Sequence, residues 1–209
     1  MNDTGTPRWL TWAREIQALS QSGLMYSQSE FDTERYHRLT AIAAEIVAEH
    51  STLETRALAA SFSEQAGYAT PKVDVRAAVL EEEQVLLVQE RSDGQWALPG
   101  GWADVGEPPS EAVEREVREE TGLEVKARKI IAVFDANRDV GPLALYHAYR
   151  IVFLCELVGG QISSSHETLT AGYFPFDGLP PLSRNRTSER YLAEVLAHVR
   201  NNHRPAVFD

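Results

Sequence analysis

The hydrophobic periodicity of the chain changes at one place, the segment AGYATPK over 66–72. Before this segment, apolar residues recur every three or four positions, which is the spacing of one face of an α-helix. After it, they gather in short runs that are typical of β-strands. Gly67 and Pro71 favour a linker between the two patterns. The change predicts a small all-helical domain over 1–65, a linker over 66–72 and a mixed α/β domain over 73–209.

Three helices are expected in the N-terminal domain. The first carries an apolar stripe over 9–19 and is expected to break at Gly23, and a longer helix follows capping residues within 29–33. A third, short helix is expected over about 52–62. Because three short amphipathic helices cannot bury all of their apolar faces alone, we expect them to serve in dimerisation or in closing over a substrate. A homodimer is the predicted state.

The second domain alternates strands with helices. Strands are expected over 73–80, 85–91, 144–160 and 172–176, with a short one in GQWALPGG (94–101), and helices over 109–122 and 187–200. The single cysteine, Cys155, lies in an apolar run and is expected to be a buried packing residue. A single cysteine also excludes an internal disulfide and a cysteine-based zinc cluster.

Composition narrows the function classes. The chain has 209 residues, 43% of them hydrophobic and 24% charged, as in globular proteins. Its net charge of −11 argues against broad, non-specific binding to nucleic acid. No window approaches the roughly 18 apolar residues of a membrane span, and the N-terminus lacks the basic start and apolar core of a signal peptide. We therefore expect a cytoplasmic protein without a membrane or stable nucleic-acid partner.

Nearly half of the negative charge is concentrated in 101–123, where seven acids and two bases give a net charge of −5. Within the predicted helix, Glu116, Glu119 and Glu120 are spaced i, i+3, i+4 and share one face. Carboxylates clustered beside a core are unfavourable unless a cation neutralises them, and oxygen ligands suit Mg²⁺ or Mn²⁺. The alternative is a solvated, salt-bridged helix, which is the usual role of such a charge run.

The loop before this helix adds further candidates. The sequence Pro-Gly-Gly at 99–101 lets the backbone approach a ligand closely, and a free carbonyl at Gly101 would be another oxygen ligand. Glu107 either orients the site or stabilises the start of the helix through its dipole. Arg115 is spaced to reach Glu119 and to hold that carboxylate in place.

Taken together, these residues resemble the signature of the Nudix hydrolases, whose fixed positions are all filled here: Gly101, Glu107, Arg115, Glu116, Val117, Glu119, Glu120, Gly122 and Leu123. The resemblance implies an α/β/α sandwich around a mixed sheet and hydrolysis of a nucleoside diphosphate linked to another moiety, with Mg²⁺ or Mn²⁺. By position, it implies that the three glutamates of the helix bind metal, that the Gly101 carbonyl is a further ligand, and that Arg115 positions the glutamates.

The N-terminal stretch over 12–39, the segment FPFDGLPPLS and a terminal FD resemble a bacterial Nudix subgroup. That subgroup includes CDP-choline pyrophosphatases and proteins called ADP-ribose pyrophosphatases. The resemblance implies cleavage of a small nucleotide-diphosphate substrate to a nucleoside monophosphate and a phosphorylated product. Two alternatives remain: an enzyme that processes RNA 5′ ends or caps, and a non-enzymatic ligand sensor on a Nudix fold.

Hydrolysis also requires a group that accepts a proton from the attacking water. Glu116 is one candidate, and Glu167, in the loop SSSHETLTAG, is the other. Related pyrophosphatases often place a base or a metal ligand in this loop, commonly with a second acid three residues on. This chain has Thr170 there, which leaves Glu167 as the acid of the loop. The alternative for Glu167 is a solvated loop acid, and His166 is interpreted as an ordinary loop residue.

The candidates for substrate binding are aromatic and basic residues after the signature. Tyr173 and Phe174 are predicted to stack on a base, and Phe134 and Tyr146 share this possibility, although aromatic residues at strand spacing more often belong to the core. Arg138 and Arg184 are predicted to hold a phosphate or a terminal group, with Arg186 as a further candidate.

Overall fold

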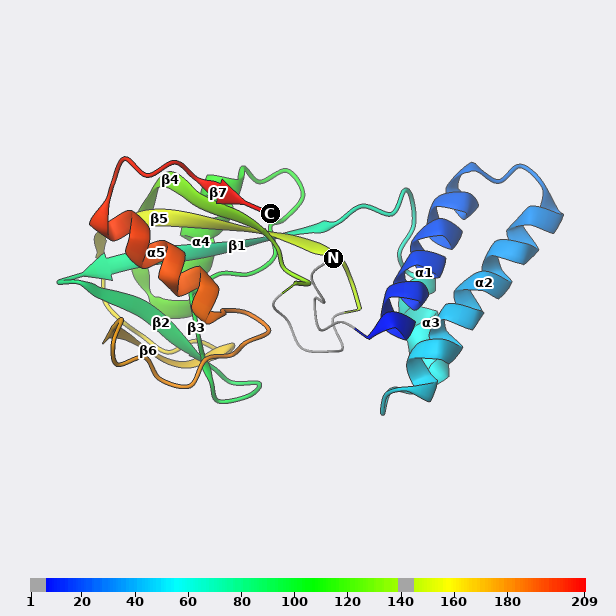
Figure 1. Ribbon diagram of the computed structural model, residues 1–209, viewed down its shortest axis with the longest axis horizontal. Coiled ribbons are helices and arrows are strands. Elements are labelled where there is room, and N and C mark those ends of the chain that lie inside the picture. Colours follow the sequence, from blue (N-terminus) through cyan, green and yellow to red (C-terminus); the bar gives the residue numbers. More distant parts are fainter. Residues whose placement is uncertain (1–6, 139–144) are drawn as a thin grey trace. The chain divides into compact units, whose positions relative to one another are not determined.

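The computed structural model describes residues 7–138 and 145–209. It divides into two compact units (Figure 1). The first is helical and consists of residues up to Pro71 together with 145–147, and the second contains the sheet. The short segment 145–147 therefore belongs to the helical unit, although the sequence pattern placed it in the α/β domain.

The helical unit consists of α1 (Arg8–Tyr26), α2 (Glu30–Glu49) and α3 (Thr55–Ser63). Its helices surround a small core whose side chains are at most 5% exposed: Leu10, Ala13, Ala43, Ala44, Val47, Leu58 and Phe62. Leu145 and Tyr146 pack against this core, and the Tyr146 hydroxyl lies 2.6 Å from Oγ of Ser61. The expected helical domain is thus present, and Tyr146 serves its packing.

The expected break at Gly23 is wrong, because α1 continues to Tyr26. A Cβ atom at position 23 would lie 2.3 Å from the ring of Tyr36 on α2. The glycine therefore gives the Tyr36 ring room to lie against the backbone of α1, and it does so without ending the helix.

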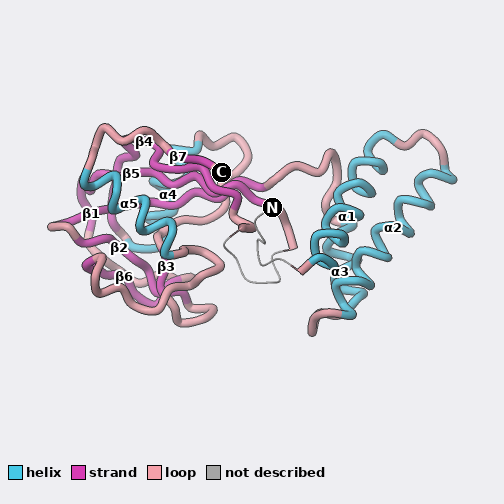
Figure 2. The backbone as a smooth tube through the Cα atoms, viewed as in Figure 1, coloured by secondary structure: helices cyan, strands magenta, loops and turns pink. Residues whose placement is uncertain are grey.

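The second unit is built on a seven-stranded mixed sheet (Figure 2, strands magenta). Its strands are β1 (Lys72–Glu81), β2 (Gln84–Glu90), β3 (Trp96–Ala97), β4 (Leu123–Asp135), β5 (Ala148–Gly160), β6 (Thr168–Pro175) and β7 (Val207–Phe208). The order is β3-β2-β1-β5-β4-β7, and β6 pairs with β2. Strand β5 lies parallel to β1 and antiparallel to β4, which makes the sheet mixed as expected.

Two helices cover opposite faces of the sheet, α4 (Pro109–Thr121) and α5 (Glu189–Arg200) (Figure 1). Val113 and Val117 of α4 pack on the face that Val75 of β1 presents. Leu192 and Val195 of α5 pack on the opposite face. This arrangement confirms the predicted α/β/α sandwich.

Two strands, β4 and β7, were not expected from the sequence. Strand β4 is interrupted by charged residues and by three register shifts, so its apolar residues do not alternate regularly. Strand β7 has two residues, too few for a periodic signal. The strand expected over 144–160 begins at Ala148, and its first position, 144, lies outside the described residues.

Cys155 is 4% exposed within the core that α4 covers, as expected of a packing residue. Burial raises the pKa of its thiol to about 12, so the side chain stays protonated at neutral pH. Among the described residues, no helix is both long and apolar enough to cross a membrane.

The β1–β2 hairpin opens soon after its turn, and this opening positions the candidate site. The two strands pair at Leu80 with Val85 and at Glu81 with Gln84. Nearer the start of β1, farther from the turn, the loop 99–103 takes the place of β2 as the hydrogen-bonding partner of β1. Its backbone exchanges three bonds with β1: Val75 N–H to Gly101 C=O at 2.8 Å, Ala77 N–H to Pro99 C=O at 2.8 Å, and Ala103 N–H to Val73 C=O at 3.0 Å.

Candidate active site

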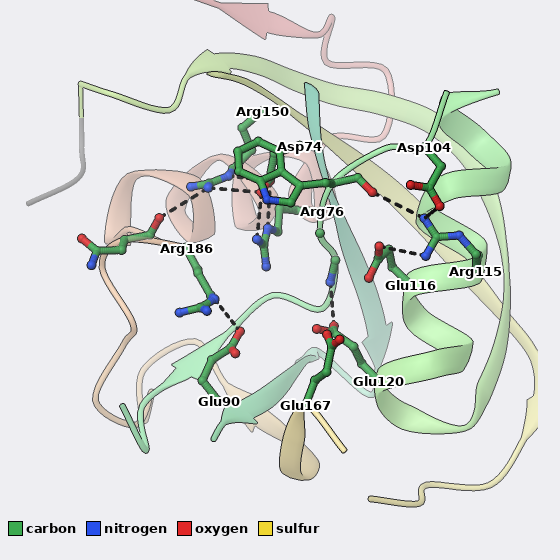
Figure 3. Close-up of a pocket in the computed structure, with 14 residues that line it drawn as sticks. Asp74, Arg76, Glu90, Asp104, Arg115, Glu116, Glu120, Arg150, Glu167 and Arg186 are labelled. Carbon is green, nitrogen blue, oxygen red and sulfur yellow. Dashed lines mark hydrogen bonds and ion pairs between the residues drawn. The ribbon is translucent and has the colours of Figure 1, made fainter. Parts of the chain in front are cut away.

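A cavity of about 530 Å³ lies where the loop 99–103 meets α4 (Figure 3). Ten of its described lining residues are charged: Asp74, Arg76, Glu90, Asp104, Arg115, Glu116, Glu120, Arg150, Glu167 and Arg186. The remaining four are Gly100, Gly101, Trp102 and Asn185. The cavity thus brings together the Nudix-like signature, the loop of Glu167 and charged residues of β1 and β5.

Helix α4 brings two of its three candidate glutamates to the cavity. The helix begins at Pro109 and ends at Thr121, and the following Gly122 has a φ of 74°, the left-handed conformation common after helices. Glu116 and Glu120 lie one turn apart and are 9% and 5% exposed. Glu119 points more toward solvent, with a side chain 54% exposed, and does not line the cavity.

Arg115 connects the acidic residues of the signature. Its Nε donates to Glu107 at 3.0 Å, and its Nη1 donates to Glu116 at 2.9 Å and to Glu119 at 3.0 Å. Its Nη2 donates to the Trp102 carbonyl at 3.4 Å. The bonds from Arg115 hold the pKa of Glu107 below its ordinary value. Arg115 therefore makes the contacts expected of a residue that positions the glutamates.

The two glycines of the loop are required for different reasons. Gly100 has a φ of 140°, and a Cβ atom there would lie 2.0 Å from the Val75 carbonyl oxygen. Its N–H donates to Glu120 at 2.8 Å. A Cβ atom on Gly101 would lie 3.0 Å from the Glu116 carboxylate. Both glycines therefore let the loop lie close to β1 and to the glutamates.

The expectation of a free carbonyl at Gly101 is wrong. That oxygen accepts the N–H of Val75 at 2.8 Å, because the loop pairs with β1. A carbonyl oxygen has a second lone pair, so a role as a further metal ligand stays a prediction.

The buried carboxylates are destabilised as anions. Burial raises the pKa of Glu120 to about 8, although Arg76 and the Gly100 N–H oppose the shift. Burial likewise raises the pKa of Glu116, against the opposing effect of Arg115, and that of Glu90, against Arg186 and Arg76. A bound cation would relieve this destabilisation directly.

The residues of the cavity fit a divalent cation in chemistry, but they do not form a preassembled cage. Among the described residues, no three His, Cys, Asp or Glu side chains converge closely enough to hold a metal ion. The available donors are carboxylate oxygens, which Mg²⁺ and Mn²⁺ prefer. Arg115 engages one oxygen of Glu116 and one oxygen of Glu119, so each carboxylate keeps its other oxygen for a metal.

Glu167 reaches the cavity from the loop before β6 (Figure 3). The next residue, Thr168, is fully buried, and its hydroxyl donates to the Glu120 carbonyl at 2.7 Å. That bond ties the loop to α4. The side chain of Glu167 is 62% exposed and lies 3.2 Å from the exposed ring of His166.

A buried ionic network at the cavity was missed by sequence reasoning. Asp74 of β1 accepts two bonds of 2.9 Å from Arg76 and one of 2.7 Å from Arg150 of β5. All three residues are at most 4% exposed. The Arg150 guanidinium also lies over the Tyr191 ring, 5.5 Å from its centroid. Charged residues within the otherwise apolar strand 73–80 were the available signal.

The structure does not bring the predicted substrate-binding residues to this cavity. Tyr173 and Phe174 pack against the two cores of the sheet, and Phe134 stacks on Tyr191 in the core. Arg138 pairs with Asp209 and Arg184 with Glu189, and neither lines the cavity.

Arg186 does line the cavity. Its Nε lies 3.0 Å from Glu90, and 35% of its side chain is exposed.

Two family models match the chain. One, described as a UDP-X-like, N-terminal oligomerisation domain, matches residues 7–62, and the NUDIX domain matches residues 70–195. The chain belongs to the Nudix hydrolase family. The resemblance carried by the signature is thereby confirmed.

Two of the following three relatives match nearly the whole length of this Nudix hydrolase. The Bacillus subtilis (strain 168) protein YjhB, whose name proposes an ADP-ribose pyrophosphatase activity, is 37% identical over 202 residues, 97% of each chain. A solved structure named UDP-X diphosphatase is 34% identical with a TM-score of 0.63, and the match covers 96% of this chain and 98% of that one. A solved ADP-ribose pyrophosphatase from Streptococcus suis 89-1591 is 39% identical with a TM-score of 0.61, over 67% of this chain and all of that one. The chain is thus a Nudix pyrophosphohydrolase.

Replacing Asp74 with Asn should destabilise the α/β unit by about 3–5 kcal/mol, because two buried arginines would lose their counter-ion. Burial alone would raise the pKa of Asp74, but Arg76 and Arg150 outweigh it and hold the pKa below its ordinary value. Its stabilising effect is therefore complete above pH of about 4 and is lost as the pH falls through the folded-state pKa. Urea unfolding at several pH values measures the free energy of unfolding of the wild type and of Asp74→Asn. The difference between the two should shrink in acid.

Asp104→Asn is the matched control, because Asp104 lines the same cavity with a side chain 80% exposed and lies 3.8 Å from Arg115. Removing the charge of this exposed side chain should lower the free energy of unfolding by less than about 1 kcal/mol. Equal losses in the two variants would contradict the assigned role of the buried network.

Proposed function

We propose that this Nudix protein is a metal-dependent pyrophosphohydrolase that cleaves nucleoside diphosphates linked to another moiety, of the ADP-ribose, CDP-choline or UDP-X type. The products are a nucleoside monophosphate and a phosphorylated second product. The observation that carries the proposal is the pair of buried carboxylates, Glu116 and Glu120, facing one cavity beside Arg115. The names of the full-length relatives support the substrate class.

Glu116, Glu119 and Glu120 would hold Mg²⁺ or Mn²⁺, with the Gly101 carbonyl as a further ligand. When bound, the metal neutralises charge on the diphosphate and lowers the pKa of a coordinated water. Arg115 keeps the glutamates oriented through its bonds to Glu107, Glu116 and Glu119.

We assign proton acceptance to Glu167. The carboxylate of Glu116 is already engaged by Arg115 at 2.9 Å and would also hold the metal, which leaves it less free to accept a proton. Glu167 is more exposed than Glu116 and lines the same cavity as Glu116 and Glu120, so a water in that cavity would be within its reach. The buried bond from Thr168 to Glu120 keeps the Glu167 loop next to α4.

Arg186 would bind a phosphate of the substrate. Of the four arginines that line the cavity, it has the most exposed side chain, 35%, compared with 21% for Arg115 and at most 5% for the other two. Its Nε lies 3.0 Å from Glu90 in an ion pair (Figure 3). A guanidinium is well suited to a phosphate because it donates in a planar fork.

The helical unit would form a homodimer. Its exposed apolar side chains include Trp12, Leu19 and Tyr26, which recur every seven residues along one face of α1 and are at least 50% exposed. Phe31 of α2, 73% exposed, adds to this apolar surface. The description of the matching N-terminal model as an oligomerisation domain supports a second copy of the chain as the partner.

Replacing Glu119 or Glu120 with Gln should reduce kcat/KM by about 100-fold or more, because a metal contributes several kcal/mol to the transition state. Release of nucleoside monophosphate is measured from ADP-ribose, CDP-choline, UDP-sugars and NAD-capped RNA, with each divalent metal. Glu111→Gln is the control, since Glu111 is an exposed residue of the first turn of α4. Absence of turnover by the wild-type protein across this panel would overturn the proposed function.

Replacing Arg186 with Ala should raise KM by about 10-fold or more, because a charge-assisted hydrogen bond to phosphate is worth about 1.5–3 kcal/mol. Arg184→Ala is the matched control: it lies two residues away, its side chain is 74% exposed, and it pairs with Glu189 outside the cavity. Steady-state kinetics on the best substrate of the panel compares the two. Equal effects of the two substitutions would argue against the assigned role of Arg186.

Replacing Leu19 with Glu should convert the dimer to a monomer of 23.3 kDa, because the charge would lie in the apolar interface. Light scattering after gel filtration at micromolar concentration measures the mass. Leu53→Glu is the control: it lies in the same unit, outside the three helices, and is 42% exposed. A wild-type protein of monomer mass would refute the homodimer.

A further inference from the structure

Trp102 is the single aromatic residue among the described residues that line the catalytic cavity, and it is 52% exposed. Other aromatic residues of the α/β unit have ring partners. Phe134 stacks on Tyr191 with centroids 4.7 Å apart, and Trp96 meets Phe174 edge-on at 4.6 Å. Within the described residues, no such ring contact holds Trp102. An indole is thus presented to solvent at the edge of a cavity that is otherwise charged or polar.

The backbone of Trp102 is held on both sides. The preceding carbonyl, of Gly101, accepts the Val75 N–H, and the following N–H, of Ala103, donates to the Val73 carbonyl. The Trp102 carbonyl itself accepts Arg115 Nη2 at 3.4 Å. The indole therefore projects from a backbone segment that β1 and Arg115 keep in place, and little ordering is needed when a flat ligand binds to it.

The position of Trp102 relative to the glutamates suits one part of a nucleotide. Trp102 directly follows Gly101, whose Cα faces the carboxylate of Glu116. In a nucleoside diphosphate, one ribose separates the base from the first phosphate. When the diphosphate lies at Glu116 and Glu120, the base would lie one ribose away from these glutamates. Trp102 borders the cavity at that place.

We propose that the Trp102 indole stacks on the nucleobase of the substrate. This inference rests on the proposed function, because it takes the diphosphate to bind at Glu116 and Glu120. Every base has a π-face, so stacking on an indole binds the nucleoside half without selecting one base. The moiety on the other side of the diphosphate would then extend away from Trp102.

Kinetics of two variants test the inference. Trp102→Ala should raise KM about 10- to 100-fold for nucleoside diphosphate substrates, with kcat changed by less than about threefold, and Trp102→Phe should retain most of the affinity. The inhibition constant of a nucleoside monophosphate should rise in parallel, while that of ribose 5-phosphate, which has no base, should not change. Val105→Ala is the matched control, because Val105 lies three residues after Trp102, is fully exposed and does not line the cavity.

Tryptophan fluorescence tests the same contact without turnover. Titration with UMP or AMP should quench the wild-type protein and Trp12→Phe, but not Trp102→Phe, and ribose 5-phosphate should quench none of them. Quenching that persists in Trp102→Phe, or an unchanged KM in Trp102→Ala, would overturn the inference. An equal loss of affinity for ribose 5-phosphate would also overturn it, because the indole would then act on the sugar or on the loop.

The two proposals fail in distinguishable ways. If the wild-type protein hydrolyses no nucleoside diphosphate substrate, the proposed function fails, while quenching by nucleoside monophosphates still decides whether Trp102 binds a base. If the wild-type protein is active and Trp102→Ala has an unchanged KM, only the stacking inference fails.

Discussion

The backbone pairing of the loop 99–103 with β1 is the interaction on which the site depends. The loop occupies the side of β1 that β2 leaves free after a short hairpin, and its bonds to β1 are 2.8–3.0 Å long. This pairing sets three contacts at once: the Gly100 N–H to Glu120, the close approach of Gly101 to Glu116, and the Trp102 carbonyl to Arg115. Strand β1 thus orients the glutamates of α4 through one loop.

Charge is arranged at the cavity in two ways. Asp74 holds Arg76 and Arg150 in a network that is almost fully buried, where each charge has its partner within the protein. The carboxylates of α4 are less fully compensated, and burial raises the pKa of both Glu116 and Glu120. The first arrangement stabilises the wall of the cavity, and the second leaves a demand for positive charge at its centre.

The sequence was informative where a local rule determines the structure. Helix α4 was expected over 109–122, close to its observed limits, because a proline begins it and Gly122 follows it. Strand β4 was missed because Lys126, Arg128 and Lys129 interrupt its apolar residues and its pairing with β5 shifts register. In that strand, pairing with a neighbour decides the conformation, and the local pattern does not reveal the neighbour.

The candidate site was predicted where its residues are close in sequence. Arg115 and the glutamates lie within a few turns of one helix, so their spacing showed that they could meet. Asp74 and Arg150 are 76 residues apart, and their bond exists because β1 and β5 are parallel neighbours. The structure places Tyr173 and Phe174 against the cores, because their strand spacing is equally that of core residues, and their role in substrate binding stays a prediction.

The contacts of Arg115 have a consequence for how the site would accept a cation. The guanidinium donates to one oxygen of Glu116 and to one oxygen of Glu119, so the second oxygen of each carboxylate is left for a ligand. A metal would then be bound by one oxygen from each of these glutamates. Such one-oxygen binding would leave positions on the ion open to the oxygens of a diphosphate and to water.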